Sequence, residues 1–226
     1  MSGEDYAEAK RVAGEAINRV HKKGISPEQL ATMYDEWAET YDKELSMEVY
    51  KGPEYVAEAL AELYTDKSKP SKVEAKILDI AAGTGRIGIF LHKLGFRNMD
   101  ALDPSEKMLE KLRKHGIYGT TWKDTIGMYQ TEIPDGAYDA TVSSGALGGG
   151  HIPVKAIHEM VRIVRPGGFL VNIIREEYLT NSEEYRKLEP LFEELQVSNK
   201  LIMISRKVVP KYSLDNNGVV FVHKVL

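Results

Sequence analysis

Hydrophobic positions follow two different periods along the chain, and the change falls near residue 72. Before it, apolar residues recur three and four positions apart, which is the spacing of one helix face. The clearest such stripe is Leu30, Met33, Tyr34, Trp37 and Tyr41. After it, short apolar runs alternate with amphipathic segments, as in βαβ units with a parallel sheet. The pattern predicts a helical extension or lid over 1–72 and an α/β core over 73–226, in one structural domain.

Start and stop signals divide the helical extension into three helices. Residues 4–22 form a polar helix that ends at Gly24, and residues 53–64 form a third helix before the polar linker 65–71. The second helix begins at Ser26-Pro27-Glu28-Gln29, which combines a capping box with proline at the first helical position.

The core is expected to hold seven strands with helices between the early ones. The expected strands are 76–81, 98–102, 117–122, 137–143, 168–174, 199–208 and 218–225, and the expected helices are 86–94, 105–114 and 154–163. Only residues 209–217 separate the last two strands, which is too short for a helical crossover. Because this segment ends in Asn217-Gly218, we expect a turn there and an antiparallel final pair.

Composition narrows the class of protein. The chain has 226 residues, 42% of them hydrophobic, which is enough for one well-packed core. Its 30 basic and 34 acidic residues give a net charge of -4, so neither nucleic acid nor an anionic membrane is expected as a partner. It has no cysteine, no signal-like N-terminus and no apolar run of about 20 residues, which predicts a soluble, cytoplasmic protein. Its six histidines have no metal-ligand spacing, so no metal is expected.

A glycine-rich loop follows the first expected strand. Gly83, Gly85 and Gly88 have the G-x-G-x-x-G spacing, which by itself indicates only close backbone approach to a ligand at a helix N-terminus. Asp79 lies in the strand below the loop, and a pyrophosphate about 4 to 5 Å from that carboxylate would cost several kcal/mol. A cationic ligand avoids this cost, which favours S-adenosylmethionine over a dinucleotide. Asp103 ends the second strand, where an acidic side chain commonly accepts hydrogen bonds from ribose hydroxyls of either ligand.

Four segments resemble the successive motifs of class I S-adenosylmethionine-dependent methyltransferases. They are "ILDIAAGTG", "ALDPSEKMLEKLRKHG", "IPDGAYDATVSSGAL" and "VRIVRPGGFLVNII", between Ala75 and Ile174. The segments "YDEWAETYDKEL", "SSGALGGGHIP" and "NSEEYRKLEPLFEEL" resemble more narrowly the Williams-Beuren syndrome region methyltransferase-like proteins. The resemblance implies a Rossmann-like, mostly parallel seven-stranded sheet of order 3-2-1-4-5-7-6 with an antiparallel last strand. It also implies S-adenosylmethionine as cofactor and S-adenosylhomocysteine as product.

The resemblance assigns expected roles to residues of this chain. Asp79, Ala81, Gly83 and Gly85 are expected at the methionine end of the cofactor, Asp103 at the ribose, and Pro104, Met108, Asp124 and Thr125 at the adenine. Ser143, with Ser144 and Gly145, is expected beside the sulfonium, and Tyr34, Trp37 and Tyr41 in a helix that folds over it. Ala81 stands where many relatives have glycine.

Several of the candidate residues also have a purely structural interpretation. Asp79 and Asp103 could cap loops, the aromatic stripe could only pack the core, and Gly88 is expected to let its helix lie close to the first strand. His151 is a candidate general base, or else an ordinary loop histidine. Arg175 and Glu176, at the end of the fifth strand, are candidate acceptor contacts, or else a surface pair.

The sequence therefore favours methyl transfer from S-adenosylmethionine to a nucleophilic atom of a small molecule. A nicotinamide-dependent oxidoreductase and a non-catalytic methyltransferase-like binding module stay open as alternatives. The acceptor and the oligomeric state do not follow from the sequence.

Overall fold

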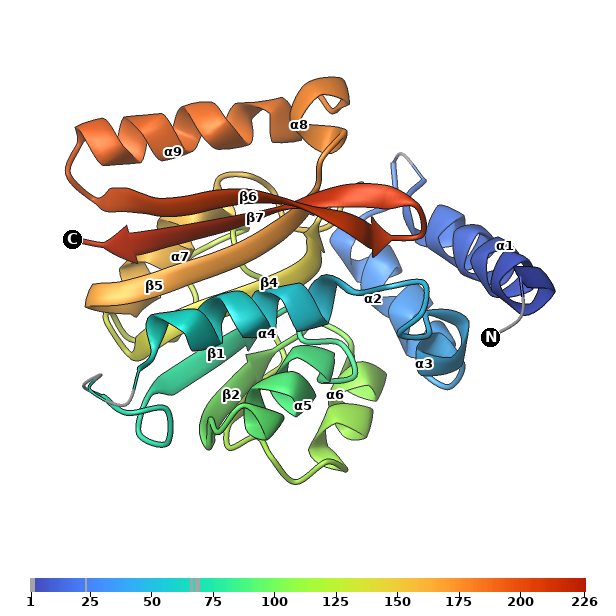
Figure 1. Cartoon of the computed structure of the whole chain (residues 1–226), viewed down its shortest axis with the longest axis horizontal. Coiled ribbons are helices and arrows are strands. Elements are labelled where there is room, and N and C mark those ends of the chain that lie inside the picture. Colours follow the sequence, from blue (N-terminus) through green and yellow to red (C-terminus); the bar gives the residue numbers. More distant parts are fainter. Residues whose placement is uncertain (1–2, 23, 66, 68–69) are drawn as a thin grey trace.

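The sheet has the strand order that the family resemblance implied. A computed structural model describes residues 3–22, 24–65, 67 and 70–226. The seven strands run β3-β2-β1-β4-β5-β7-β6, with β7 antiparallel to both β5 and β6 (Figure 1). They are β1 Lys76–Ile80, β2 Asn98–Leu102, β3 Thr121–Trp122, β4 Tyr138–Leu147, β5 Val164–Arg175, β6 Leu201–Ser213 and β7 Asn216–Val225. The prediction of a mostly parallel sheet with an antiparallel final pair is confirmed.

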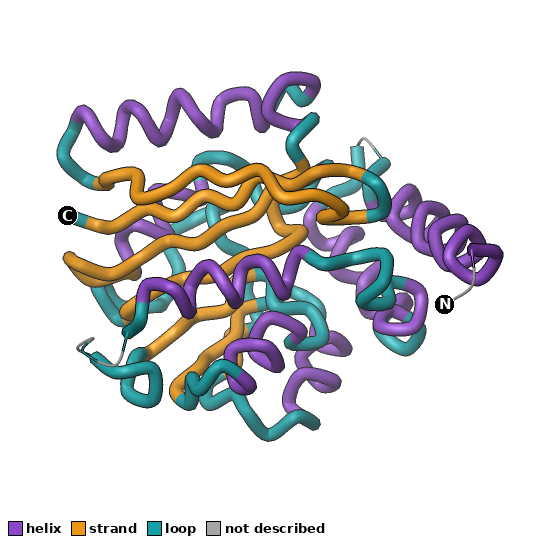
Figure 2. The backbone as a smooth tube through the Cα atoms, in the orientation of Figure 1, coloured by secondary structure: helices purple, strands orange, loops and turns teal. Residues whose placement is uncertain are grey.

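Helices cover both faces of this sheet (Figure 2). They are α1 Gly3–Val20, α2 Pro27–Trp37, α3 Tyr41–Glu44, α4 Gly52–Leu63, α5 Arg86–Lys93, α6 Glu106–Arg113, α7 Ala156–Ile163, α8 Tyr178–Asn181 and α9 Leu188–Val197, with a short 3-10 turn at Tyr185–Lys187. Alternate strand residues face opposite sides, so Ile77 packs in the core beneath α4 and α5 while Leu78 packs in the core beneath α7 and α9.

The N-terminal helices serve two different purposes. Helix α4 packs against β4, β5 and α5, so it belongs to the helical layer of the sheet. Helices α1, α2 and α3 gather at one end of the sheet (Figure 1), and we call these three the helical cover. The predicted capping box at the start of α2 is confirmed, since Ser26 and Gln29 each accept a hydrogen bond from the other's backbone N–H.

Several predicted element boundaries were wrong, and the site is affected by two of them. Strand β4 continues to Leu147, so Ser143, Ser144 and Gly145 lie inside the strand and not after it. The β6–β7 turn lies at Leu214 and Asp215, not at Asn217-Gly218. Gly218 is instead a strand residue, and a Cβ added there would approach the Cβ of Tyr212 to 2.7 Å. The presence of glycine at position 218 therefore reflects close packing and not a turn.

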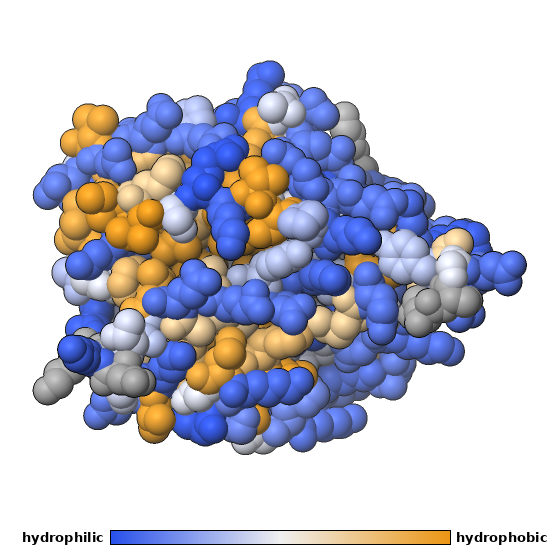
Figure 3. Space-filling model, viewed as in Figure 1, coloured by the Kyte–Doolittle hydropathy of each residue, from blue (hydrophilic) through white to orange (hydrophobic). Residues whose placement is uncertain are grey.

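The edge strand β6 leaves apolar side chains exposed. Figure 3 shows such side chains between α9 and α4, where β6 and β7 cross this face, and those of β6 are Ile202, Met203, Ile204 and Val208. Within the described residues, none of the helices combines the length and apolar character needed to cross a bilayer.

Candidate functional site

The glycine loop turns sharply between β1 and α5. Ala81, Gly83 and Gly85 all have positive φ, at 53°, 54° and 87°, and Gly85 is the residue before the first turn of α5. Positive φ is ordinary for glycine but uncommon for alanine. The loop nevertheless accommodates the Ala81 side chain, and Ala81 and Gly83 both line a pocket.

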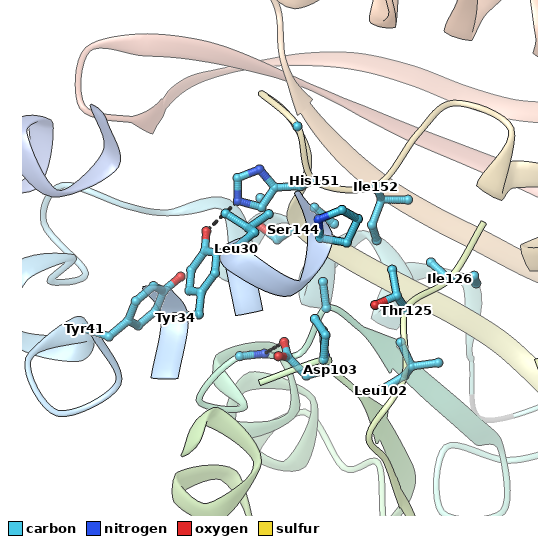
Figure 4. Close-up of a pocket in the computed structure, with 17 residues that line it drawn as sticks. Leu30, Tyr34, Tyr41, Leu102, Asp103, Thr125, Ile126, Ser144, His151 and Ile152 are labelled. Atoms are coloured by element: carbon cyan, nitrogen blue, oxygen red, sulfur yellow. Dashed lines mark hydrogen bonds between the residues drawn. The ribbon is translucent and has the colours of Figure 1, made fainter. Parts of the chain in front are cut away.

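Asp103 joins this loop to the end of β2. Its Oδ2 accepts a hydrogen bond from the Gly83 N–H at 2.8 Å (Figure 4), and its Oδ1 accepts one from the Ser105 N–H at 2.9 Å. Burial raises the pKa of this carboxyl to about 6, against the effect of the two N–H donors. A carboxylate has further lone pairs, so Asp103 can still accept hydrogen bonds from a ligand in the pocket that it lines.

Asp79 lies beneath the loop and not at the pocket wall. It is 1% exposed, its Oδ2 accepts a hydrogen bond from the Tyr118 hydroxyl at 2.7 Å, and its buried Oδ1 has no partner within the described residues. Burial raises its pKa to about 7, with a further increase from Asp103. At neutral pH this carboxyl is therefore only partly ionised, which makes the repulsion of a pyrophosphate smaller than a full charge implies.

A pocket opens above the loop, and we call it the loop pocket. It encloses about 760 Å³ of space free of protein atoms, counting its open mouth. Its lining residues are Pro27, Leu30, Tyr34, Tyr41, Ala81, Gly83, Leu102, Asp103, Pro104, Thr125, Ile126, Ser144, Gly145, Ala146, Gly150, His151 and Ile152 (Figure 4). Helix α2 of the cover thus supplies one wall and the carboxyl ends of β1, β2 and β4 the others.

His151 is bonded on both ring nitrogens. Its Nδ1 lies 3.0 and 3.2 Å from the carbonyl oxygens of Gly148 and Gly149, which can only accept, so Nδ1 carries the proton. Its Nε2 therefore accepts from the Tyr34 hydroxyl at 2.7 Å (Figure 4). Burial lowers the His151 pKa, which keeps the ring neutral. The candidate base lines the loop pocket, but its Nε2 is occupied by the Tyr34 hydroxyl.

A second pocket adjoins the first, and we call it the aromatic pocket. It is lined by Ile17, Val20, His21, Tyr34, Trp37, Tyr41, Leu45, Tyr50, Gly145, Leu147, Gly148, Arg175, Tyr178, Tyr212 and Ser213. Tyr34, Tyr41 and Gly145 line both pockets. Burial raises the pKa of both tyrosines, so their hydroxyl groups are neutral at the boundary between the two spaces.

Several residues expected in the site line neither pocket. Met108 is buried, Gly85 contacts Leu112 and Tyr118, and Ser143 bonds to the Asn172 side chain at 2.7 Å. Asp124 is bonded to the Tyr129 hydroxyl and to the Thr125 N–H, while Thr125 itself lines the loop pocket.

Of Trp37 and the two candidate acceptor contacts, only Glu176 lies outside the aromatic pocket. Trp37 and Arg175 line the aromatic pocket, whereas Glu176 bonds to the Asn217 side chain instead. The surface pair forms between Arg175 and Glu177, at 3.1 Å, and not between Arg175 and Glu176.

Sequence reasoning missed Tyr118, His21 and Tyr50. The Tyr118 hydroxyl donates to Asp79 and accepts from the Gly88 N–H at 3.0 Å, and a Cβ on Gly88 would lie 2.1 Å from it. Gly88 was expected to let its helix lie close to the first strand, but its close neighbour is instead the Tyr118 side chain. His21 and Tyr50 reach the aromatic pocket from the cover and from the segment before α4. No local motif marks any of these three positions.

Two aspartates fasten the helical cover to the core. Asp35 of α2 accepts hydrogen bonds from the Ser105 hydroxyl at 2.6 Å and the Lys107 N–H at 3.0 Å, at the start of α6. Asp42 of α3 accepts one from the Thr84 hydroxyl at 2.7 Å, beside the glycine loop. Both contacts place the cover directly over the loop pocket.

Part of the chain is similar to known methyltransferases. Residues 77–168 match the methyltransferase domain family. Human methyltransferase-like protein 27 is 32% identical over 70% of this chain and 61% of its own length. A demethylmenaquinone methyltransferase from Clavibacter sepedonicus is 29% identical over 64% of this chain and 57% of its own. The chain thus spans about three fifths of the curated relatives it matches.

Solved structures show the same fold at low sequence identity. The [4+2]-cyclase SpnF superimposes with a TM-score of 0.65 at 14% identity, covering 88% of this chain and 96% of its own. A putative S-adenosylmethionine-dependent methyltransferase from Methanococcus maripaludis gives a TM-score of 0.52 at 18% identity, covering 90% and 95%. At such identities the likeness concerns the fold alone.

Proposed function

We propose that this chain transfers a methyl group from S-adenosylmethionine to a small-molecule acceptor, because residues 77–168 match the methyltransferase domain family and the chain is similar to methyltransferase-like protein 27. The observation that carries the proposal is the charge of the loop pocket. Asp103 is its one charged side chain among the described residues, and no lysine or arginine lines it. Such a wall suits a cationic nucleoside and offers no side-chain cation to a pyrophosphate.

The residues present fit the proposed cofactor. Asp103 would accept hydrogen bonds from the ribose, Ala81 and Gly83 would lie along the methionine end, and Pro104 and Thr125 would contact the adenine. The unpartnered Oδ1 of Asp79 lies under the same loop and would stabilise positive charge above it. Met108, Gly85, Asp124 and Ser143 would support this wall from behind without contacting the ligand.

Bound there, S-adenosylmethionine supplies an electrophilic methyl group on a positively charged sulfur. The protein's part is to hold an acceptor in line with that methyl group, because orientation alone accounts for much of the rate of such a displacement. Tyr34 and Tyr41 line both pockets, so their rings would flank the methyl group as it crosses. Aromatic faces attract a cation, which stabilises the sulfonium before transfer.

The aromatic pocket is the proposed acceptor site. An acceptor that must lose a proton would donate it to the Tyr34 oxygen as Tyr34 passes its own proton to the neutral Nε2 of His151. His151 then acts through Tyr34 and not by direct contact. The match to a demethylmenaquinone methyltransferase supports a small-molecule acceptor, although the chain spans only 57% of that relative.

A ligand-dependent shift in melting temperature tests the proposal. At 100 times the dissociation constant, S-adenosylmethionine or S-adenosylhomocysteine should stabilise the protein by about 2.7 kcal/mol, or roughly 5 to 10 °C for a chain of this size. NAD should give no shift. A shift with NAD alone would favour the oxidoreductase alternative. Binding of both adenosyl ligands without any methylated product from labelled cofactor and cell extract would favour the binding-module alternative.

A further inference from the structure

The two adjoining pockets carry opposite charge. The loop pocket has the carboxylate of Asp103, whereas Arg175 is the one permanently charged side chain among the described residues that line the aromatic pocket, and none of them is acidic. His21, on the same wall, is neutral because burial lowers its pKa to about 4, with further contributions from His151 and Arg175. The aromatic pocket therefore has a single positive charge.

Arg175 is partly buried and not fully bonded. Its side chain is 15% exposed at the end of β5, and its Nη1 donates to Oε1 of Glu177 at 3.1 Å. Glu177 lies toward solvent, with 47% of its side chain exposed. The Nε of Arg175 is buried and has no partner within the described residues. A buried guanidinium N–H without an acceptor is unusual in a folded protein, and a bound carboxylate would supply the missing oxygen.

The walls around Arg175 are flat and apolar. Its guanidinium lies over the Tyr178 ring, 5.1 Å from the centroid, and Tyr178 in turn stacks on Tyr185 at 6.1 Å. Tyr50 and Tyr212 pack edge to face at 5.7 Å elsewhere in the same pocket. Rings held in this way form rigid surfaces against which another planar ring packs well.

We propose that the methyl acceptor is a small aromatic carboxylate, bound through its carboxylate to the Arg175 guanidinium with its ring among the tyrosines of the aromatic pocket. This inference rests on the proposed function and specifies its acceptor. A single positive charge matches a monoanion and disfavours an amine. Arg175 and the boundary residues Tyr34 and Tyr41 line one pocket, so we expect an acceptor of about one ring.

Matched ligand pairs test the charge preference. The pairs are 4-hydroxybenzoate with 4-hydroxybenzamide, 3,4-dihydroxybenzoate with 3,4-dihydroxybenzamide, and 4-hydroxycinnamate with its amide, and tyramine is the cationic probe. Calorimetry is carried out in the presence of saturating S-adenosylhomocysteine. The carboxylate of at least one pair should bind tenfold or more tightly than its amide, and tyramine should bind most weakly.

Variants assign the preference to one side chain. Arg175→Met should remove it by weakening carboxylate binding at least tenfold, while the affinity for S-adenosylhomocysteine stays within twofold of wild type. Arg175→Lys should retain part of it. Arg206→Met is the matched control, because Arg206 of β6 pairs with Glu189 of α9 and lines neither pocket. Melting curves establish that each variant is folded.

The outcomes separate the two proposals. Absence of a carboxylate preference across all pairs in wild type, or an unchanged preference in folded Arg175→Met, would overturn the acceptor assignment while binding of S-adenosylhomocysteine stands. Failure of wild type to bind S-adenosylhomocysteine would instead overturn the proposed function.

Discussion

One tyrosine hydroxyl connects the carboxylate under the glycine loop to the helix that follows it. Tyr118 donates to Asp79 and accepts from the Gly88 N–H. The position of this hydroxyl explains why residue 88 has no side chain, since a Cβ there would lie 2.1 Å from the Tyr118 oxygen. The third glycine of the G-x-G-x-x-G spacing therefore maintains a hydrogen bond of the site and does not itself approach the loop pocket.

A pair of glycine substitutions tests this explanation. Glycine to alanine inside a helix ordinarily stabilises by about 1 kcal/mol. Gly14→Ala in α1 should do so, because its new Cβ would meet only Leu214 at 3.9 Å. Gly88→Ala in α5 should instead destabilise by about 1 to 3 kcal/mol, since Tyr118 must move. Urea unfolding gives both values, and a gain at both positions would contradict the role of Tyr118.

Asp103 is expected to govern cofactor affinity at the residue scale. Asp103→Ala removes the proposed ribose acceptor and leaves the Gly83 and Ser105 N–H groups without their partner. We expect a loss of S-adenosylhomocysteine affinity of at least tenfold, together with about 1 to 3 kcal/mol of stability. Calorimetry and urea unfolding separate the two effects. An unchanged affinity in the folded variant would rule out the ribose assignment.

At the scale of elements, two aspartates contribute polar contacts that hold the helical cover over the loop pocket. Asp35 bonds to the start of α6, and Asp42 bonds to Thr84 of the loop. The cover therefore has contacts that can be removed without altering the sheet.

The double variant Asp35→Ala, Asp42→Ala should loosen the cover. We expect faster amide hydrogen exchange in α2 and α3, unchanged exchange in β1, β4 and β5, and several-fold weaker binding of S-adenosylhomocysteine. Glu193→Ala, an exposed substitution on α9, is the control. Unchanged exchange in α2 of the double variant would show that these two aspartates are not needed to hold the cover in place.

The sequence was sufficient for the sheet but not for the complete site. The short connection between β6 and β7 predicted their antiparallel pairing, and the family resemblance implied the strand order. Position-specific motifs identified Ala81, Gly83, Asp103 and Thr125, which line the loop pocket. Tyr118, His21 and Tyr50 went unpredicted because they reach the site by tertiary packing from segments without a local signal. The prediction of a turn at Asn217-Gly218 was wrong, because the glycine at position 218 reflects close packing against the Tyr212 side chain.

At the scale of the whole molecule, buried carboxyl groups link stability to pH. Burial raises the Asp79 pKa from 3.8 to about 7, so the folded state holds a proton that the unfolded state releases near pH 4. Stability from this group is therefore greatest below pH 4 and falls as pH rises toward 7. Above pH 7, Asp79 is ionised in both the folded and the unfolded state, so its effect on stability no longer changes with pH.

Asp79→Asn should remove this dependence. The variant should gain stability relative to wild type as pH rises from 5 to 8, by up to a few kcal/mol, since each pKa unit corresponds to about 1.4 kcal/mol. Urea unfolding of both proteins without ligand measures the difference at each pH. Because Asp103 and the buried histidines are present in both, they cancel in that difference to a first approximation. A difference that is constant with pH would show that Asp79 is ionised throughout.

Contacts between the two ends of the chain determine when the cover can form during synthesis. Lys10 of α1 pairs with Asp215 in the β6–β7 turn, and the Leu214 N–H donates to the Val49 carbonyl. Lys10 and Asp215 are 205 residues apart, so a ribosome must reach Asp215 before α1 finds this partner. The central strands can pair earlier, whereas the aromatic pocket, which Tyr212 and Ser213 line, acquires its final wall only after the last hairpin has emerged.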